Sequence, residues 1–112
     1  VFGGAFGRFM MTELRRGATG FMPGADVVEL HVAIWNAWQA GNEAEARAVF
    51  NRLLPLINLN LSLSITQNKH LLQKRGVFTT TVSRFPGLPA LDADDLHELE
   101  QIWQDIAPLL TA

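Results

Sequence analysis

Two short apolar segments, each followed by a helix, constrain the fold of this chain more than any other feature. Residues 1–4 read as the end of a buried strand that runs into a glycine turn, and residues 18–24 form a second apolar segment closed by Pro-Gly. Helices are expected over residues 8–16 and 26–40. A strand, a short helical crossover and a second strand make a parallel pair. Because two parallel strands cannot form an independent sheet, we expect a missing N-terminal part with further strands.

The rest of the chain has the pattern of capped amphipathic helices. N-cap and N3 spacing is found for Asp26 with Glu29, Asn42 with Glu45, and Asp92 with Asp95, where Leu91 and Leu96 are also placed as a hydrophobic staple. Gly41 is expected to end one helix and join it to an antiparallel neighbour. The expected apolar faces are Val27, Leu30, Ile34 and Trp38, then Ala46, Val49, Phe50, Leu53 and Leu54, and finally Leu96, Leu99, Trp103, Ile106 and Leu110.

One segment has a different period. Leucine and isoleucine alternate with asparagine and serine over residues 57–65, which on periodicity alone predicts a strand, although Pro55 does not have to end the preceding helix. Residues 67–75 are again helix-like and close with Gly76, and residues 83–89, with two prolines, are expected to be a loop.

Composition excludes several classes of site. A chain of 112 residues with 48% apolar and 18% charged residues is expected to be one globular domain. The absence of cysteine excludes disulfides, thiolate zinc sites and a cysteine nucleophile. A net charge of −2 argues against a general nucleic-acid binder, and no apolar run is long enough for a membrane span or a signal peptide. We therefore expect a cytoplasmic protein without nucleic-acid or membrane partners.

No complete catalytic set is visible in the sequence. Gly3, Gly4 and Gly7 lack the spacing of a dinucleotide or phosphate loop, so they indicate a tight turn or, alternatively, a turn whose N–H groups donate to a substrate carboxylate. The three histidines, His31, His70 and His97, have no metal-ligand spacing and are expected to face solvent on helices. Lys69 and Lys74 are expected at the surface, the carboxylates that begin the last helix on a solvated face, and Trp35, Trp38 and Trp103 in core or interface packing.

Several segments, taken in order, resemble one family. They are VFGG (1–4), ELRRGATGFMPG (13–24), GNEAEA (41–46), RLLPL (52–56) and KHLLQKRG (69–76). Together they resemble the C-terminal third of the dihydrodipicolinate synthase / N-acetylneuraminate lyase family, over essentially the whole chain. The resemblance implies an α/β fold in which residues 1–41 are the last two βα units of a (β/α)₈ barrel and residues 42–112 a C-terminal helical domain. It also implies helix, regular or irregular, over residues 57–65.

The resemblance further implies a class I Schiff-base lyase, aldolase or dehydratase without a cofactor, assembled as a homo-oligomer (tetramer or dimer). The family's Schiff-base lysine and proton-relaying tyrosine lie upstream of Val1, so this chain is expected to hold no catalytic residue. The part of the family's active site that the resemblance assigns to this chain is the wall of the substrate pocket at the strand ends. The implied substrate-binding residues are Gly4, Ala5, Phe6, Met22, Pro23 and Gly24.

The substrate implied is pyruvate or a 2-keto-3-deoxy sugar acid. In members that act on sialic acid, acidic residues follow the strand-seven glycine, whereas this chain has Ala5, Phe6 and Gly7 there. The Gly-Gly-x-x-Gly-Arg run, with Met-Pro in the second strand segment, looks more like the branch that dehydrates keto-deoxy sugar acids. Two other interpretations stay open: a helical interaction module that binds a partner helix through its tryptophan-bearing faces, and a small nucleotide-binding domain built on the glycine turn.

Overall fold

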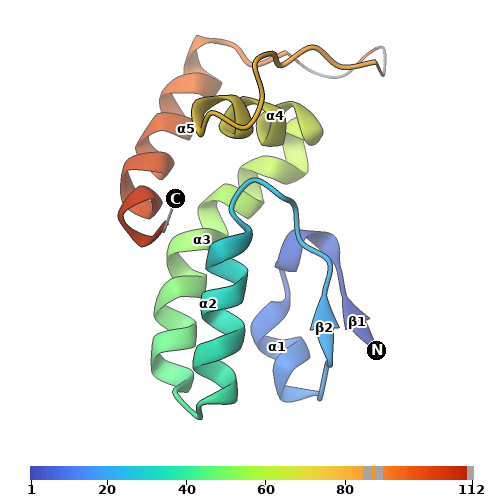
Figure 1. Cartoon of the computed structure of the whole chain (residues 1–112), viewed down its shortest axis with the longest axis vertical. Helices are drawn as coiled ribbons and strands as arrows, with labels where there is room; N and C mark the ends of the chain where they lie inside the picture. The colour runs from blue at the N-terminus through green and yellow to red at the C-terminus, as the bar shows by residue number, and fades with distance from the viewer. Residues whose placement is uncertain (85–86, 88–89, 111–112) are drawn as a thin grey trace.

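The computed structural model describes residues 1–84, 87 and 90–110. Strands and helices alternate first, and helices alone follow (Figure 1). The elements are β1 (Phe2–Gly3), the 3-10 turn η1 (Ala5–Gly7), α1 (Met10–Arg15), β2 (Gly20–Phe21), α2 (Val28–Gln39), α3 (Glu43–Leu63), α4 (Ile65–Lys74), α5 (Ala93–Ile106) and the 3-10 turn η2 (Ala107–Leu109). Four residues of the loop expected over 83–89, namely Phe85, Pro86, Leu88 and Pro89, lie outside the described residues.

The parallel strand pair predicted from the sequence is confirmed. Phe2 pairs with Gly20 and Gly3 with Phe21, and α1 forms the crossover between them. The expectation that the first strand is buried is wrong for Val1 and Phe2, which are exposed because no element of the described residues covers the outer edge of β1. On the opposite side, Phe21 meets Trp35 of α2 edge to face, with ring centroids 6.3 Å apart.

Helices α2 and α3 form an antiparallel pair, as predicted, and lie beside the strands (Figure 1). Gly41 joins them with a φ of +79°, a conformation that side chains disfavour. The N–H of Asn42 then donates to the carbonyl oxygen of Ala37 at 2.8 Å, which closes the end of α2. The Asn42 side chain in turn accepts the backbone N–H of Glu45 at 3.1 Å, so the predicted cap of α3 is confirmed.

Residues 57–65 are helical, as the family resemblance implied, and the strand that their alternation predicts is wrong. Helix α3 continues through Pro55 to Leu63, and α4 begins at Ile65 after a break at Ser64. The side chains that face the core recur at helical intervals, so alternate leucines do not share a face. The buried set is Leu56, Ile57, Asn60 and Leu63, whereas Leu61 is exposed.

The expectations for Asp26, Leu54 and Leu96 are corrected. Asp26 does not cap α2; the N-cap residue is Val27, without a side-chain hydrogen bond, and Asp26 is buried instead. Leu54 and Leu96, expected on apolar faces, are exposed because α3 and α5 turn them away from their neighbours. The capping box that begins α5 is confirmed, since Asp92 accepts the N–H of Asp95 at 2.8 Å and the Asp95 carboxylate accepts that of Asp92 at 3.2 Å.

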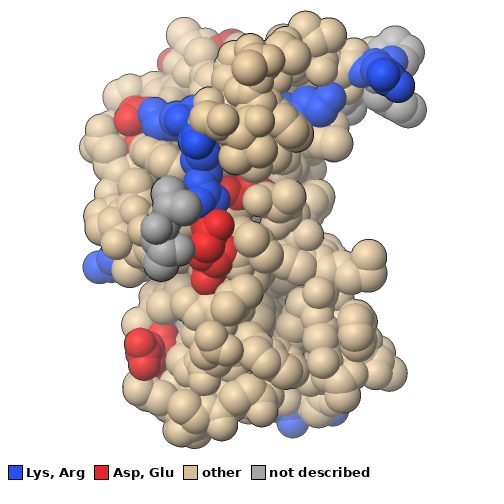
Figure 2. Space-filling view, in the orientation of Figure 1, with Lys and Arg blue, Asp and Glu red and all other residues tan. Residues whose placement is uncertain are grey.

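The core lies along α3, which packs against both α2 and α5, and α1 adds buried side chains to it. Its fully buried members include Leu30, Ile34, Leu53 and Ile106. Charged side chains gather over α4 and α5 on the face shown in Figure 2, whereas the region of β1, β2 and α1 carries few. Within the described residues, no helix combines the length and apolar character needed to cross a membrane.

Candidate functional site

The carboxyl ends of β1 and β2 lie side by side because the strands are parallel. The N–H of Met22 donates to the carbonyl oxygen of Gly3 at 3.0 Å, which extends the pairing just past β2. The six predicted wall residues are therefore brought to one end of the pair: Gly4, Ala5 and Phe6 after β1, and Met22, Pro23 and Gly24 after β2. Met22 is 73% exposed, whereas Phe6 packs against the core.

A left-handed turn follows β1. Ala5, Phe6 and Gly7 have φ angles of 52°, 57° and 81°, and the N–H of Gly7 donates to the carbonyl oxygen of Gly4 at 3.0 Å. A Cβ atom on Gly7 would lie 2.9 Å from the His31 ring, so both the backbone angle and the available space require glycine there. Gly4 is different, since a Cβ atom on it would have no neighbour within 4 Å.

Four buried polar residues lie next to this turn, and we call them the strand-end cluster: Asp26, His31, Asn60 and Asn68. The Nε2 atom of His31 lies 3.0 Å from the carbonyl oxygen of Phe6, which links α2 to the turn. A small cavity is lined by Phe6, Gly24 and three members of the cluster, Asp26, His31 and Asn60. The cluster therefore borders the runs that follow both strands.

Gly24 allows the cluster to close over the end of β2. A Cβ atom at this position would lie 2.9 Å from the Asn68 amide nitrogen and 2.9 Å from a carboxylate oxygen of Asp26. The backbone of Asp26 is held as well, because the Arg75 guanidinium donates to its carbonyl oxygen at 2.7 Å and to Glu29 at 2.8 Å. Residues from α2 and α4 thus fix the chain that leaves β2.

Burial changes the pKa of two members of the cluster in opposite directions. It raises the pKa of the Asp26 carboxyl, although neighbouring backbone groups, the Asn68 amide and His31 oppose this. It lowers the pKa of the His31 imidazole, although the carbonyls of Phe6 and Val27 and the Asp26 carboxylate oppose this. Each shift favours the uncharged form of the residue.

His31 is the residue that the sequence interpretation missed. It was expected to face solvent, but only 5% of its surface is exposed. Its spacing contained the signal, since it lies four residues after Val27 and three before Ile34, on the apolar face of α2. His97 is exposed, as expected, and His70 is half-buried on α4.

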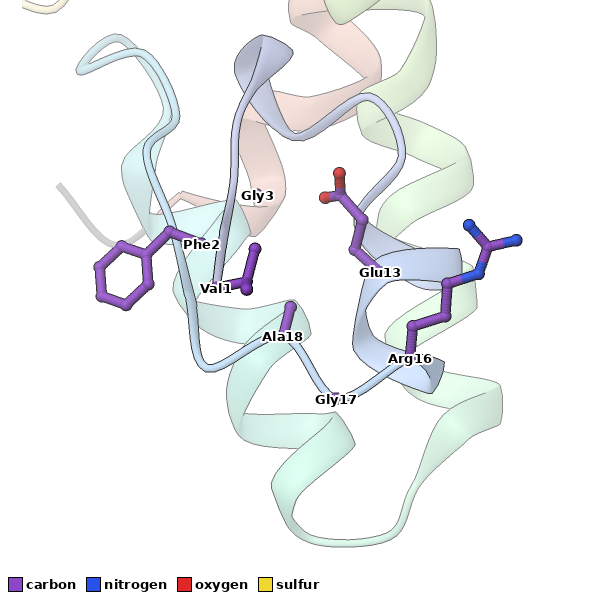
Figure 3. A pocket seen from close by; sticks show the side chains of 7 residues that line it. All are labelled: Val1, Phe2, Gly3, Glu13, Arg16, Gly17 and Ala18. Atoms are coloured by element: carbon purple, nitrogen blue, oxygen red, sulfur yellow. The ribbon is translucent and has the colours of Figure 1, made fainter.

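Two further pockets flank the strands. One, of about 260 Å³, lies between β1 and α1, and Figure 3 shows the side chains that line it: Val1, Phe2, Gly3, Glu13, Arg16, Gly17 and Ala18. One carboxylate oxygen of Glu13 is buried there without a hydrogen-bond partner among the described residues. The other pocket, of about 240 Å³, lies on the α2 side of β2, where Pro23, His31 and Trp35 contribute to its lining.

The lysines lie away from the strand ends. The ammonium group of Lys69 donates to the carbonyl oxygen of Val82 at 3.1 Å, and Lys74 pairs with Glu100 beside the Trp103 ring. Trp35, Trp38 and Trp103 all pack against the core, in agreement with the sequence prediction. No group of three histidine, cysteine, aspartate or glutamate side chains in the described part of the chain could hold a metal ion.

Known proteins resemble this chain in both sequence and structure, although no protein-family model matches it. L-2-keto-3-deoxyarabonate dehydratase from Azospirillum brasilense is 33% identical over 102 residues, which cover 90% of this chain and 33% of that enzyme. The crystal structure of dihydrodipicolinate synthase from Rhodopseudomonas palustris matches with a TM-score of 0.84 and 28% identity, over 91% of this chain and 34% of that one. The chain therefore spans about a third of the length of each relative.

Proposed function

Because the chain belongs to the dihydrodipicolinate synthase family by sequence and by fold, we propose that it forms the C-terminal part of a Schiff-base lyase. In this proposal residues 1–41 are the last two βα units of a (β/α)₈ barrel and residues 42–112 are an appended helical domain. The exposed edge of β1 supports the first assignment, since parallel strands are stable only within a larger sheet. We expect the enzyme to assemble as a homo-oligomer.

The strand ends form one wall of the substrate pocket in this proposal. Active sites of such barrels lie at the carboxyl ends of the strands, where Gly4, Ala5 and Phe6 stand beside Met22, Pro23 and Gly24. The open space at Gly4 is the observation that carries the assignment, because it lets a substrate approach the backbone. The Schiff-base lysine and the proton-relaying tyrosine come from the rest of the barrel, outside this chain.

The substrate is pyruvate or a 2-keto-3-deoxy sugar acid. Residues 5 and 6, alanine and phenylalanine, bring no carboxylate to the wall, so this part of the pocket is not built to bind many sugar hydroxyls. The relative that is 33% identical dehydrates 2-keto-3-deoxyarabonate, as its name states, and this supports the sugar-acid branch. In that branch the chemistry is the loss of a hydroxyl group as water from a 2-keto-3-deoxy sugar acid held as a Schiff base.

Gly4→Phe tests the assignment in the full-length enzyme. The added ring fills the wall, so we expect KM for the 2-oxo acid to rise at least tenfold or turnover to be lost, with an unchanged midpoint of thermal unfolding because the site is open. Ala33→Phe, on an exposed face of α2, is the matched control and leaves both quantities unchanged. Wild-type kinetics in the Gly4→Phe enzyme contradict the pocket assignment.

A further inference from the structure

His31 contacts the left-handed turn at two points. Its Nε2 atom lies 3.0 Å from the carbonyl oxygen of Phe6, and its ring packs so closely on Gly7 that no Cβ atom would fit there. Because a carbonyl oxygen can only accept, this contact is a hydrogen bond when the proton of the neutral ring sits on Nε2. This contact ties α2 to a backbone segment 25 residues earlier in the chain.

The turn needs such an external contact. Ala5 and Phe6 both have positive φ angles, which cost energy for residues with a Cβ atom and persist only where the surroundings hold them. The turn's own hydrogen bonds use the carbonyl oxygens of Gly4 and Ala5, at 3.0 and 3.1 Å, and not that of Phe6. The His31 ring therefore supplies a contact that the turn itself does not make.

Two other members of the strand-end cluster, Asp26 and Asn60, line the same small cavity as His31. Asp26 lies beside Gly24 and the Asn68 amide, and it lines the same small cavity as His31 and Phe6, so the cluster contacts the segments that follow both strands. Both Asp26 and His31 are at least nine-tenths buried, at 4% and 5% exposure, so solvent does not compete for these contacts. A shift of His31 would therefore disturb the turn that follows β1.

We propose that His31 is a positioning residue, whose Nε2–H group holds the carbonyl of Phe6 and thereby sets the course of the Gly4–Ala5 backbone along the substrate pocket. This inference rests on the proposed function for the pocket, but the contact itself can be tested without any activity. His31→Leu keeps most of the volume and removes the donor, whereas His31→Gln keeps an N–H donor of similar reach. His97→Leu, on the exposed side of α5, is the matched control.

Hydrogen–deuterium exchange of the protein that contains this chain measures the first effect. In His31→Leu the amides of Gly7 and Arg8, which close the turn, should exchange at least tenfold faster, while amides in the core of α3 are unchanged. His31→Gln and His97→Leu should stay within threefold of wild type. An unchanged rate in His31→Leu overturns the proposal, and so does a ¹⁵N spectrum of the unaltered protein that shows the neutral ring protonated on Nδ1, a measurement that needs no variant to fold.

Steady-state kinetics with pyruvate or a 2-keto-3-deoxy sugar acid measures the second effect. His31→Leu should raise KM at least fivefold with kcat changed less than KM, and His31→Gln should restore most of the loss. Faster exchange at the turn with unchanged KM overturns the positioning role. If the unaltered enzyme neither turns over nor binds these acids while the exchange results hold, the proposed function fails and the contact between His31 and the turn stands.

Discussion

At the scale of single residues, the strand-end cluster contains two titratable groups, Asp26 and His31, for which burial favours the uncharged form. Because the pKa of His31 is lowered, the unfolded chain binds a proton at this residue at a higher pH than the folded chain does. Because the pKa of Asp26 is raised, the folded chain keeps that proton to a higher pH than the unfolded chain. The contribution of His31 to stability is thus lost as pH falls, and that of Asp26 is lost as pH rises.

The loss of the His31 contribution to stability at low pH can be measured. Its contribution is complete above the ordinary histidine pKa of 6.5 and decreases as pH falls from 6.5 through the lowered pKa of the folded state. Between pH 7 and pH 5, the urea midpoint of the wild type should therefore fall further than that of His31→Gln, which cannot take up the proton. His97→Gln should behave as the wild type does. Equal losses in the wild type and His31→Gln would show that His31 is not buried in the neutral form.

Local sequence reasoning fails at His31 and Asp26 for the same physical reason. The spacing of Asp26 and Glu29 fits an N-cap, and a helical histidine is usually exposed, so both assignments follow from the nearest residues. Both side chains are instead buried in a cluster with Asn60 and Asn68, which α3 and α4 bring from more than 25 positions away. The glycines at the strand ends were placed correctly because turns depend on the local backbone.

At the scale of secondary-structure elements, the boundary between α3 and α4 shows how a helix pattern can be hidden. The alternation over residues 57–65 does not follow burial, because Leu61 and Ile65 are exposed while Asn60 is buried. A buried asparagine inverts the expected polarity at one position, and that is enough to imitate a strand. The family resemblance predicted helix correctly over residues 57–65 because it does not depend on the periodicity of apolar residues.

Ser64 provides a test of that boundary. Its φ of 56° and ψ of −146° lie in a region that essentially only glycine adopts, and its side chain makes no cap hydrogen bond. Ser64→Gly should therefore stabilise the fold by about 1 kcal/mol, after allowance for the greater freedom of glycine when unfolded. Ser62→Gly, two residues earlier inside α3, should destabilise it by about 0.5 kcal/mol. Chemical denaturation measures both, and the same sign for both changes would contradict the strain at Ser64.

At the scale of the whole molecule, the order of elements could be predicted and their long-range ties could not. Two strand–helix units followed by helices implied a parallel pair beside a helical part, and this arrangement is found. The contact between Arg75 and Glu29, at the start of α2, joins residues 46 positions apart, and no local sequence pattern predicts it. It connects the end of α4 to the segment that leaves β2, and so to the strand-end cluster.

The Arg75 side chain should therefore contribute more to the free energy of unfolding than an exposed cation such as Arg15 does. Only 8% of it is exposed, and it donates to Glu29 at 2.8 Å and to the Asp26 carbonyl at 2.7 Å. Arg75→Met keeps the stem but leaves a carboxylate and a carbonyl without their donor, so we expect a loss of about 2 kcal/mol, reduced by the partial exposure of Glu29. Arg15→Met, which breaks an exposed pair with Glu43, should cost less than about 1 kcal/mol. Urea unfolding compares the two, and equal costs would mean that α4 is not anchored through Arg75.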